Sequence, residues 1–197
     1  MNYAEKPTVA LSGDSRWVDG WLSSAHQVVS PNYDLRPNAM PVDLVVIHAI
    51  SLPPGQFGGD GVMQLFTNTL DPQAHPYYAG IAGVRVSAHF FIRRDGLLIQ
   101  FVPITARAWH AGLSNWQGRD RCNDFSVGIE LEGGDETAFE PIQYQTLQCL
   151  LQSLQTVLPI SAVTSHSHIA PGRKTDPGPC FDWAPVRAVC TDIAVVP

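Results

Sequence analysis

Three separate segments of the chain carry histidines, carboxylates and a lysine that could form a hydrolytic metal centre. His48 lies in the apolar run LVVIHAI, Glu130 lies in the alternating segment FSVGIELEGG, and the polar stretch SHSHIAPGRKTDPG covers residues 165–178. A neutral imidazole at the end of a buried strand suits a metal ligand, and a carboxylate in a cleft suits a general base. A lone buried histidine is more often a hydrogen-bonded core residue, so His48 alone does not decide between these roles.

The stretch 165–178 contains two candidate metal ligands. On an extended segment His166 and His168 would face the same side and could chelate one metal, and Asp176 could complete a His/His/Asp set. Lys174 could place its ammonium group where negative charge develops on a tetrahedral intermediate. A polar surface loop explains the segment equally well, because it is dense in turn-forming residues. The local sequence leaves the choice between His166 and His168 open.

Two carboxylates two positions apart, Glu130 and Glu132, also raise the alternative of a glycosidase pair. Positions two apart on a strand are separated by roughly 6.5–7 Å, near the separation that inverting glycosidases use. Residues so close in sequence rarely flank a substrate from opposite sides, and the histidines would have no role. We therefore expect Glu132 on a solvent-exposed strand face and Glu130 in the site.

Other polar and aromatic residues give weaker signals for substrate binding. Tyr77 and Trp109 could pack against a sugar ring, although ordinary core or rim packing is the alternative. Arg85, Arg107 and Arg121 could each bind a substrate carboxylate through two hydrogen bonds, although surface arginines need no such role. Hydrogen-bonded or surface positions account for the remaining histidines, which are His26, His75, His89 and His110.

The elements that must position these residues are several strands and fewer helices. Apolar β-branched residues predict a strand over 42–50, an Asp95-Gly96 turn predicts two strands within 86–104, and alternation predicts a strand over 125–134. Leucines at helical spacing predict a helix over 141–159 with a solvated glutamine face. Shorter helices are expected at 61–69 and 182–190. The pattern predicts a mixed three-layer α/β domain.

Length, charge and composition limit the possible partners. The 197 residues are expected to form one domain over 17–191, with a loose leader at 1–16 and a short tail at 192–197. A net charge of −6 without a basic stripe argues against nucleic-acid binding. We expect no membrane contact and a cytoplasmic location, because no membrane-spanning run or signal peptide is visible and the cysteines form no paired motif. No long apolar surface pattern is evident, so a monomer is expected.

Six motifs taken together resemble a known family. In chain order they are VVIHAISLPPGQFGG, HPYYAGI, VSAHFFIRRDGLLIQFVP, RAWHAG, CNDFSVGIELEG and HIAPGRKTDPGP. The same order is seen in zinc-dependent N-acetylmuramoyl-L-alanine amidases, and the resemblance covers nearly the whole expected domain. It implies the fold of peptidoglycan recognition proteins, in which helices flank a central mixed β-sheet.

The resemblance also implies a metal site and a reaction. His48, His166 and Asp176 would hold one Zn²⁺ per chain, so that His168 would lie beside the site without binding the metal. Glu130 would activate water for attack on the lactyl carbonyl group and would then protonate the leaving amine. Lys174 would stabilise the oxyanion.

The substrate implied is a muropeptide, a small molecule that carries N-acetylmuramic acid or its 1,6-anhydro form on L-alanine, in peptidoglycan recycling. Its expected contacts are Tyr77, Arg85, Trp109 and Arg121. Ala49 stands where close relatives tend to have asparagine, which removes a possible polar contact. The alternative is a peptidoglycan-binding module of the same fold without turnover, and the presence of the full ligand set weighs against it.

Overall fold

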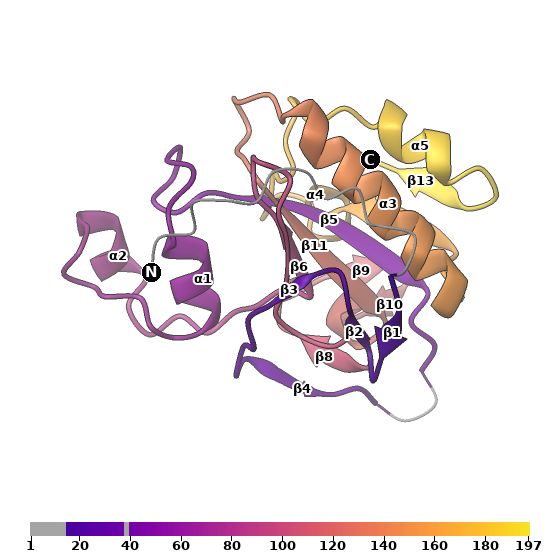
Figure 1. The fold of residues 1–197 in the computed structure, drawn as a ribbon, viewed down its shortest axis with the longest axis horizontal. Helices are drawn as coiled ribbons and strands as arrows, with labels where there is room; N and C mark the ends of the chain where they lie inside the picture. Colours follow the sequence, from indigo (N-terminus) through magenta and orange to yellow (C-terminus); the bar gives the residue numbers. More distant parts are fainter. Residues whose placement is uncertain (1–14, 38–39) are drawn as a thin grey trace.

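A computed structural model describes residues 15–37 and 40–197 of the chain (Figure 1). The leader expected at 1–16 therefore lies outside the described residues, apart from its last two positions. The strands and helices that form the domain follow in chain order: β1 (Trp17–Val18), β2 (Trp21–Leu22), β3 (His26–Gln27), β4 (Tyr33–Leu35), β5 (Leu44–Ile50), α1 (Gly61–Phe66), α2 (Pro76–Gly80), β6 (Phe90–Ile92), β7 (Leu98–Gln100), β8 (Ala106–Ala108), β9 (Asn115–Trp116), β10 (Arg119–Asp120), the 3₁₀ turn η1 (Cys122–Asp124), β11 (Ser126–Glu132), α3 (Pro141–Val157), β12 (Ala162–Ser165), α4 (His166–Ile169), α5 (Ala184–Val189) and β13 (Ala194–Val196).

A seven-stranded mixed sheet forms the centre of the domain, in the order β13-β12-β5-β11-β6-β7-β3. Neighbouring strands are parallel except β6 and β7, which pair antiparallel around the turn expected at Asp95-Gly96. Gly96 has a φ of +83°, a left-handed conformation that favours glycine. The mixed α/β fold with a central mixed sheet is confirmed.

The two central strands, β5 and β11, are covered on both faces. Val45, Ile47, Val127 and Ile129 belong to the apolar cluster that packs against the leucines of α3, and Leu44 and Val46 belong to a separate cluster with Ile169 of α4. Parallel strands buried in this way are nearly continuous apolar runs, as the sequence of β5 is. A polar residue on these strands is therefore enclosed.

The expected exposure of Glu132 is wrong for this reason. Its side chain is buried, and its two carboxylate oxygens accept hydrogen bonds from the backbone N–H groups of Gly58 and Arg94. Glu132 thus ties two loops to the end of β11. A carboxylate engaged by two structural loops is unsuited to a glycosidase pair with Glu130.

The long helix α3 begins at Pro141 as expected and lies over one face of the sheet beside α5 (Figure 1). Its glutamines are not all solvated, because Gln143 is buried and donates to the carbonyl groups of Ile92 and Glu132. Gln148 donates to the carbonyl of Pro185 in α5. The solvated glutamine face expected from the sequence is wrong at these positions, where the amides join α3 to its neighbours.

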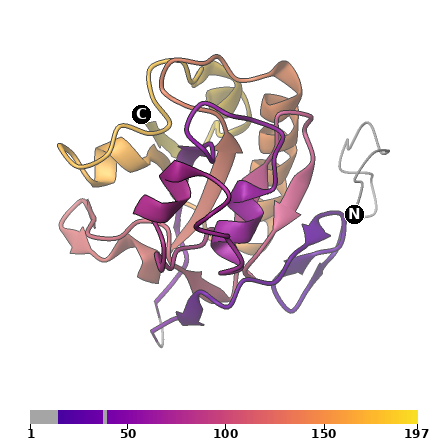
Figure 2. The ribbon, with the colours of Figure 1, turned by 90° about the vertical axis from the view of Figure 1, so that its left-hand side faces the viewer.

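The chain end and the short helices also differ from the expected boundaries. Residues 194–196, which fall in the expected tail, form β13 and pair with β12 at the sheet edge. The helices α1 and α5 occur where short helices were expected. Figure 2 shows α1 and α2 in front of the sheet, on the side away from α3. No helix in the described ranges is long and apolar enough to cross a membrane.

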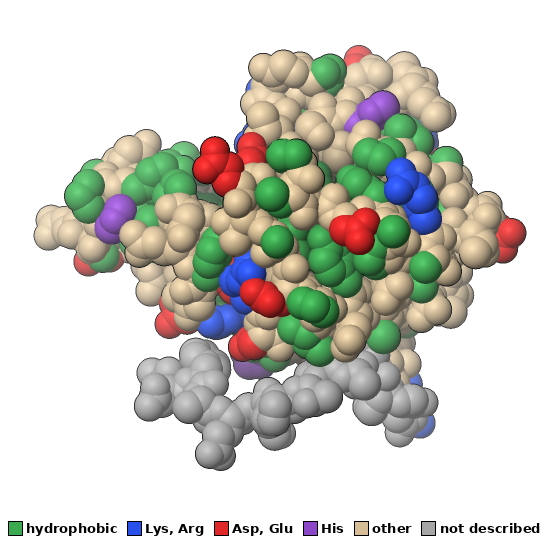
Figure 3. Space-filling model, turned by 90° about the horizontal axis from the view of Figure 1, so that it is seen from above, with side chains coloured by type: hydrophobic (Ala, Val, Ile, Leu, Met, Phe, Trp, Pro, Cys, Tyr) green, Lys and Arg blue, Asp and Glu red, His purple; other side chains and the backbone are tan. Residues whose placement is uncertain are grey.

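Charged side chains are dispersed on the face seen in Figure 3. Basic groups lie there in small separate clusters among acidic, apolar and neutral side chains. This distribution accords with the acidic net charge of −6. It differs from the continuous basic stripe that binds a phosphate backbone.

Candidate active site

Three adjacent parallel strands, β11, β5 and β12, bring the candidate residues together at their carboxyl ends. Glu130 of β11 is the register partner of His48 on β5, and Ser165 of β12 is the partner of Ile47. His166 follows Ser165 immediately. Ligand sites of open α/β sheets lie outside the carboxyl ends of parallel strands, which is where these side chains meet.

A helical turn separates the two histidines of the SHSH stretch. The Ser165 hydroxyl accepts from the His168 N–H and caps α4, so the segment is helical rather than extended. Residues two apart on a helix differ in direction by about 200°. His168 is exposed and its ring lies 5.6 Å from that of Trp116, whereas His166 is buried. The structure forms no His-x-His chelate.

Three potential donor atoms from His48, His166 and Asp176 converge on one point. The two Nδ1 atoms are 2.9 Å apart, and Asp176 Oδ2 lies 3.1 Å from that of His48 and 3.0 Å from that of His166. Tetrahedral zinc with bonds of about 2.0–2.2 Å has donor separations of about 3.3–3.6 Å, slightly longer than these. Among the described residues this is the group of histidine, cysteine and acidic side chains that could hold a metal ion.

The protonation states of His48, His166 and Asp176 favour the binding of a cation. Burial and the neighbouring His166 lower the pKa of His48 to about 4, so this imidazole is neutral at physiological pH. Burial opposes ionisation of Asp176, but the two histidines close to it hold the pKa of this carboxyl group well below its ordinary value. His166 Nε2 lies 3.2 Å from the carbonyl oxygen of Ala111, which can only accept, so a neutral His166 presents a lone pair at Nδ1. The three atoms are thus a donor set that a metal ion could bind.

Glu130 has the properties of a general base. Its side chain is buried, and its Oε2 atom has no hydrogen-bond partner in the part of the chain that the structure describes. Burial raises the pKa of Glu130 well above its ordinary value and the charge of Asp176 adds to this, while Lys174 opposes it. A carboxylate with a raised pKa and a free oxygen is able to accept a proton from a reacting water.

A cleft of about 310 Å³ opens onto these residues. Glu130, His166, Lys174 and Asp176 line it together with largely apolar side chains. Tyr77 and Trp109, expected to contact a sugar, also line this cleft, and the indole N–H of Trp109 donates to Asp34 Oδ2 at 2.7 Å. Ala49 lines the same cleft.

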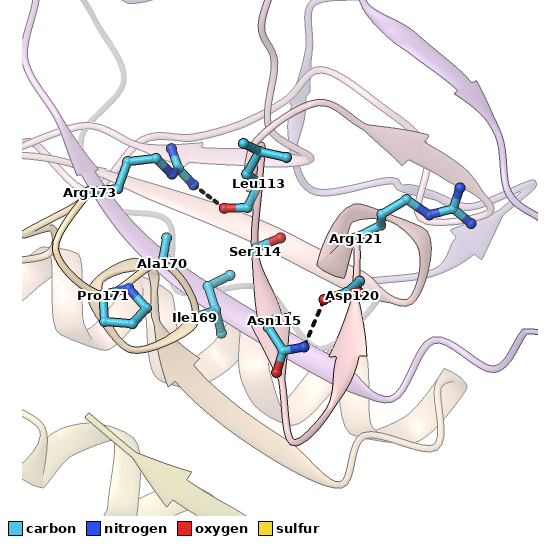
Figure 4. Close-up of a pocket in the computed structure, with 9 residues that line it drawn as sticks. All are labelled: Leu113, Ser114, Asn115, Asp120, Arg121, Ile169, Ala170, Pro171 and Arg173. Carbon is cyan, nitrogen blue, oxygen red and sulfur yellow. Dashed lines mark hydrogen bonds between the residues drawn. The ribbon is translucent and has the colours of Figure 1, made fainter.

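Arg85 and Arg121, the two arginines among the expected substrate contacts, do not line this cleft. Arg121 borders a larger cavity of about 690 Å³ between the β9–β10 hairpin and the segment after α4 (Figure 4). Arg173 borders it too and donates to the carbonyl groups of Ala111 and Leu113. Arg85 borders a small pocket beside α1. None of the candidate metal ligands lines the larger cavity, whereas His166 and Asp176 line the smaller cleft.

The sequence did not reveal that His110 contacts a candidate metal ligand, and His110 was expected to be a hydrogen-bonded or surface residue. This residue is buried, and its Nδ1 atom lies 2.9 Å from His48 Nε2. Burial lowers the pKa of His110 well below its ordinary value, and the nearby His48 adds to this effect. One sign of this packing was the glycine at position 128, because a glycine inside a strand often marks a close approach by another group. In the structure a Cβ at this position would lie 2.4 Å from the His110 ring.

The fold and the site define a candidate metallohydrolase, in which parallel strand ends present a His/His/Asp cluster beside a buried glutamate. The N-acetylmuramoyl-L-alanine amidase family model matches residues 38–179. The chain belongs to this family, which confirms the resemblance and the enzyme class expected from the sequence.

The chain is similar to individual members of this family along most of its length. The 1,6-anhydro-N-acetylmuramyl-L-alanine amidase AmpD of Citrobacter freundii is 58% identical over 175 residues, which cover 88% of this chain and 94% of that protein. A crystal structure of a selenomethionine AmpD derivative matches with a TM-score of 0.84 and 56% identity, over 87% of this chain and 97% of the other.

More distant structures share the fold. The Escherichia coli amidase AmiD, solved with anhydro-N-acetylmuramic acid-L-Ala-D-gamma-Glu-L-Lys, matches with a TM-score of 0.55 and 30% identity, over 80% of this chain and 60% of the other. Drosophila peptidoglycan recognition protein SD matches with a TM-score of 0.53 and 17% identity, over 81% of this chain and 87% of the other. The latter likeness concerns the fold alone, and it agrees with the fold that the resemblance implied.

Proposed function

We propose that this protein is a zinc-dependent amidase that cleaves the lactyl amide between 1,6-anhydro-N-acetylmuramic acid and L-alanine in muropeptides, in peptidoglycan recycling. The observation that carries the proposal is the convergence of three donor atoms beside the buried Glu130 in one cleft. The name of the AmpD relative and the ligand of the AmiD structure support the choice of an anhydromuropeptide substrate.

His48, His166 and Asp176 would hold one zinc ion per chain. Two neutral imidazoles and one carboxylate are a usual donor set for catalytic zinc, which keeps a fourth position open. Zinc would supply Lewis acidity, which makes water nucleophilic at neutral pH and polarises the substrate carbonyl group.

The proton transfers belong to Glu130. Its free Oε2 would take a proton from the attacking water, and the same carboxyl group would later give this proton to the departing amine of L-alanine. The burial that raises its pKa also favours the protonated form, which the side chain would adopt between the two transfers.

Lys174 lines the same cleft and is exposed, so its ammonium group is free to approach the substrate. A cation at this place would stabilise the oxygen that becomes negatively charged during attack. The charge of Lys174 also opposes the rise in the pKa of Glu130, which supports a place for its ammonium group near the reacting atoms.

Substrate contacts follow from the surroundings of the cleft. Tyr77 and Trp109 would pack against the sugar, and the hydrogen bond to Asp34 would hold the Trp109 ring in position. Arg121, at the larger neighbouring cavity, and Arg85 would receive carboxylates of the peptide stem.

The setting that we propose is the cytoplasm, with the protein as a monomer. All four cysteines are unpaired, which suits a reducing compartment. Size-exclusion chromatography with light scattering, at several protein concentrations, tests the oligomeric state.

The test of this function is a product analysis by mass spectrometry. The zinc-loaded protein is incubated with anhydromuramoyl-peptide and, separately, with intact cell wall, beside a Glu130→Gln control. Free peptide from the anhydro substrate, absent in the control, would support the proposal. Zinc binding without cleavage of either material would instead favour a peptidoglycan-binding module.

A further inference from the structure

His110 is built into the floor beneath the metal cluster. Its ring stands edge-on to that of His48 at 87°, with 5.0 Å between the ring centroids, and the ring of His89 lies 5.8 Å away. The absence of a side chain at Gly128 makes room for it on β11. A buried polar ring placed so closely needs defined hydrogen-bond partners.

The hydrogen bonds of His110 belong to a chain that ends at the carbonyl group of Cys122. This carbonyl group determines which atom donates in each bond of the chain. The Ser126 hydroxyl lies 2.6 Å from the carbonyl oxygen of Cys122 and 3.1 Å from His110 Nε2. A carbonyl oxygen can only accept, so the Ser126 hydroxyl donates its hydrogen to Cys122. The same hydroxyl oxygen must then accept from the Nε2–H of His110.

The direction continues from His110 to the metal ligand. A neutral His110 that carries its hydrogen on Nε2 has a lone pair on Nδ1. This Nδ1 lies 2.9 Å from His48 Nε2, so His48 carries its own hydrogen on Nε2 and donates it. His48 Nδ1 is thereby left bare, and it faces His166 and Asp176.

We propose that His110 and Ser126 are positioning residues that fix the tautomer of His48 and so present its Nδ1 lone pair to the metal ion. The proposal rests on the proposed function only in taking zinc as the metal. Partners behind a ligating histidine typically contribute 10- to 100-fold to metal affinity. We expect a loss of roughly this size when the chain is interrupted.

Four variants separate this role from simple packing. Ser126→Ala removes the anchor and leaves the ring in place, and His110→Leu removes the acceptor for His48. His110→Asn restores an acceptor near the position of Nδ1. Ser30→Ala is the matched control, because Ser30 is equally buried and its hydroxyl donates to the Phe66 carbonyl, in a bond unconnected with the cluster.

The experiment measures zinc dissociation constants by chelator competition, together with histidine ¹⁵N–¹H spectra of the metal-free and zinc-loaded full-length protein. The proposal predicts 10- to 100-fold weaker zinc binding for Ser126→Ala and His110→Leu, partial recovery in His110→Asn and no change in Ser30→Ala. The wild-type spectra should show His48 protonated on Nε2 and, with zinc, coordinated through Nδ1.

Equal affinity losses in Ser126→Ala and Ser30→Ala would overturn the proposal, as would a wild-type His48 protonated on Nδ1 when neutral. The wild-type spectra keep the test decisive if a variant does not fold. Failure of the proposed function is distinguishable, since normal zinc binding without amide cleavage would refute the amidase and leave the hydrogen-bond chain intact.

Discussion

Replacing His166 by alanine should remove a metal ligand, whereas replacing His168 should not. The two residues are two positions apart in one short helix, but only His166 faces His48 and Asp176. His168 lies against Trp116 and is exposed. His168→Ala is therefore a matched control, with the same chemical change at almost the same place in the chain.

The size of the effect follows from the number of ligands. Zinc sites with four protein ligands bind with about 10–16 kcal/mol, or about 2.5–4 kcal/mol per ligand. Losing one ligand should therefore weaken binding roughly 100- to 1000-fold. His168→Ala should change the dissociation constant by less than about threefold, because its ring contributes no donor atom to the cluster.

The assay is competition of the metal-loaded protein against a chromophoric chelator of known zinc affinity, with zinc per chain measured after dialysis. Unfolding is followed in parallel, so that a folding defect is not mistaken for loss of a ligand. Similar losses of zinc in the two variants would show that the assignment of His166 over His168 is mistaken. An unchanged affinity in His166→Ala would do the same.

Four further predictions concern the chemistry and the stability of the site. Glu130→Gln should keep zinc and lower kcat by about 10²–10⁴-fold in a peptide-release assay, and an unchanged kcat would place the general base elsewhere. The same variant should raise the free energy of unfolding of the metal-free protein at neutral pH, because the folded state raises the pKa of Glu130 and disfavours its ionised form. The gain should disappear in urea titrations as the pH falls below the ordinary range of a carboxyl group, where Glu130 is protonated in both states, and a pH-independent gain would contradict this cause. Lys174→Met should reduce kcat more than it raises KM, and an effect on KM alone would make Lys174 a binding group. Zinc at 100 times its dissociation constant should stabilise the protein by about 2.7 kcal/mol in thermal unfolding, and identical melting with and without chelator would argue against binding to the folded state.

The strands and the long helix were predictable because their patterns are local. β5 is an almost unbroken apolar run, the β6–β7 hairpin has an Asp-Gly turn, and the leucines of α3 recur at helical spacing. Each of these signals reflects how a short segment meets the core. Their positions in the structure confirm the predictions to within a few residues.

Burial on the polar face of β11 was not predictable from alternation. Period-two spacing shows that Glu130 and Glu132 share a face, but it does not show what covers that face. The loops at Gly58 and Arg94, distant in sequence, enclose Glu132. The same limitation applies to Gln143, whose amide is buried by contacts with β6 and β11.

The sequence alone could not show which site residues are neighbours in space, because this depends on the register of the parallel strands. His48 and Glu130 are 82 positions apart, and only the pairing of β5 with β11 shows that they are neighbours. The choice of His166 over His168 depended on a helical turn that the residues alone did not reveal. Resemblance to the amidase family supplied that choice in advance, whereas the role that we propose for His110 is argued only from its contacts in the structure.

Zinc titration of the metal-stripped protein, with release of peptide from anhydromuramoyl-peptide as the readout, tests whether this cluster is the catalytic centre. Peptide release should rise in proportion to added zinc and reach its plateau at one zinc ion per chain. Full activity before zinc is added, or no activity in protein that holds one zinc ion at His48, His166 and Asp176, would show that the proposed metal centre does not carry the reaction.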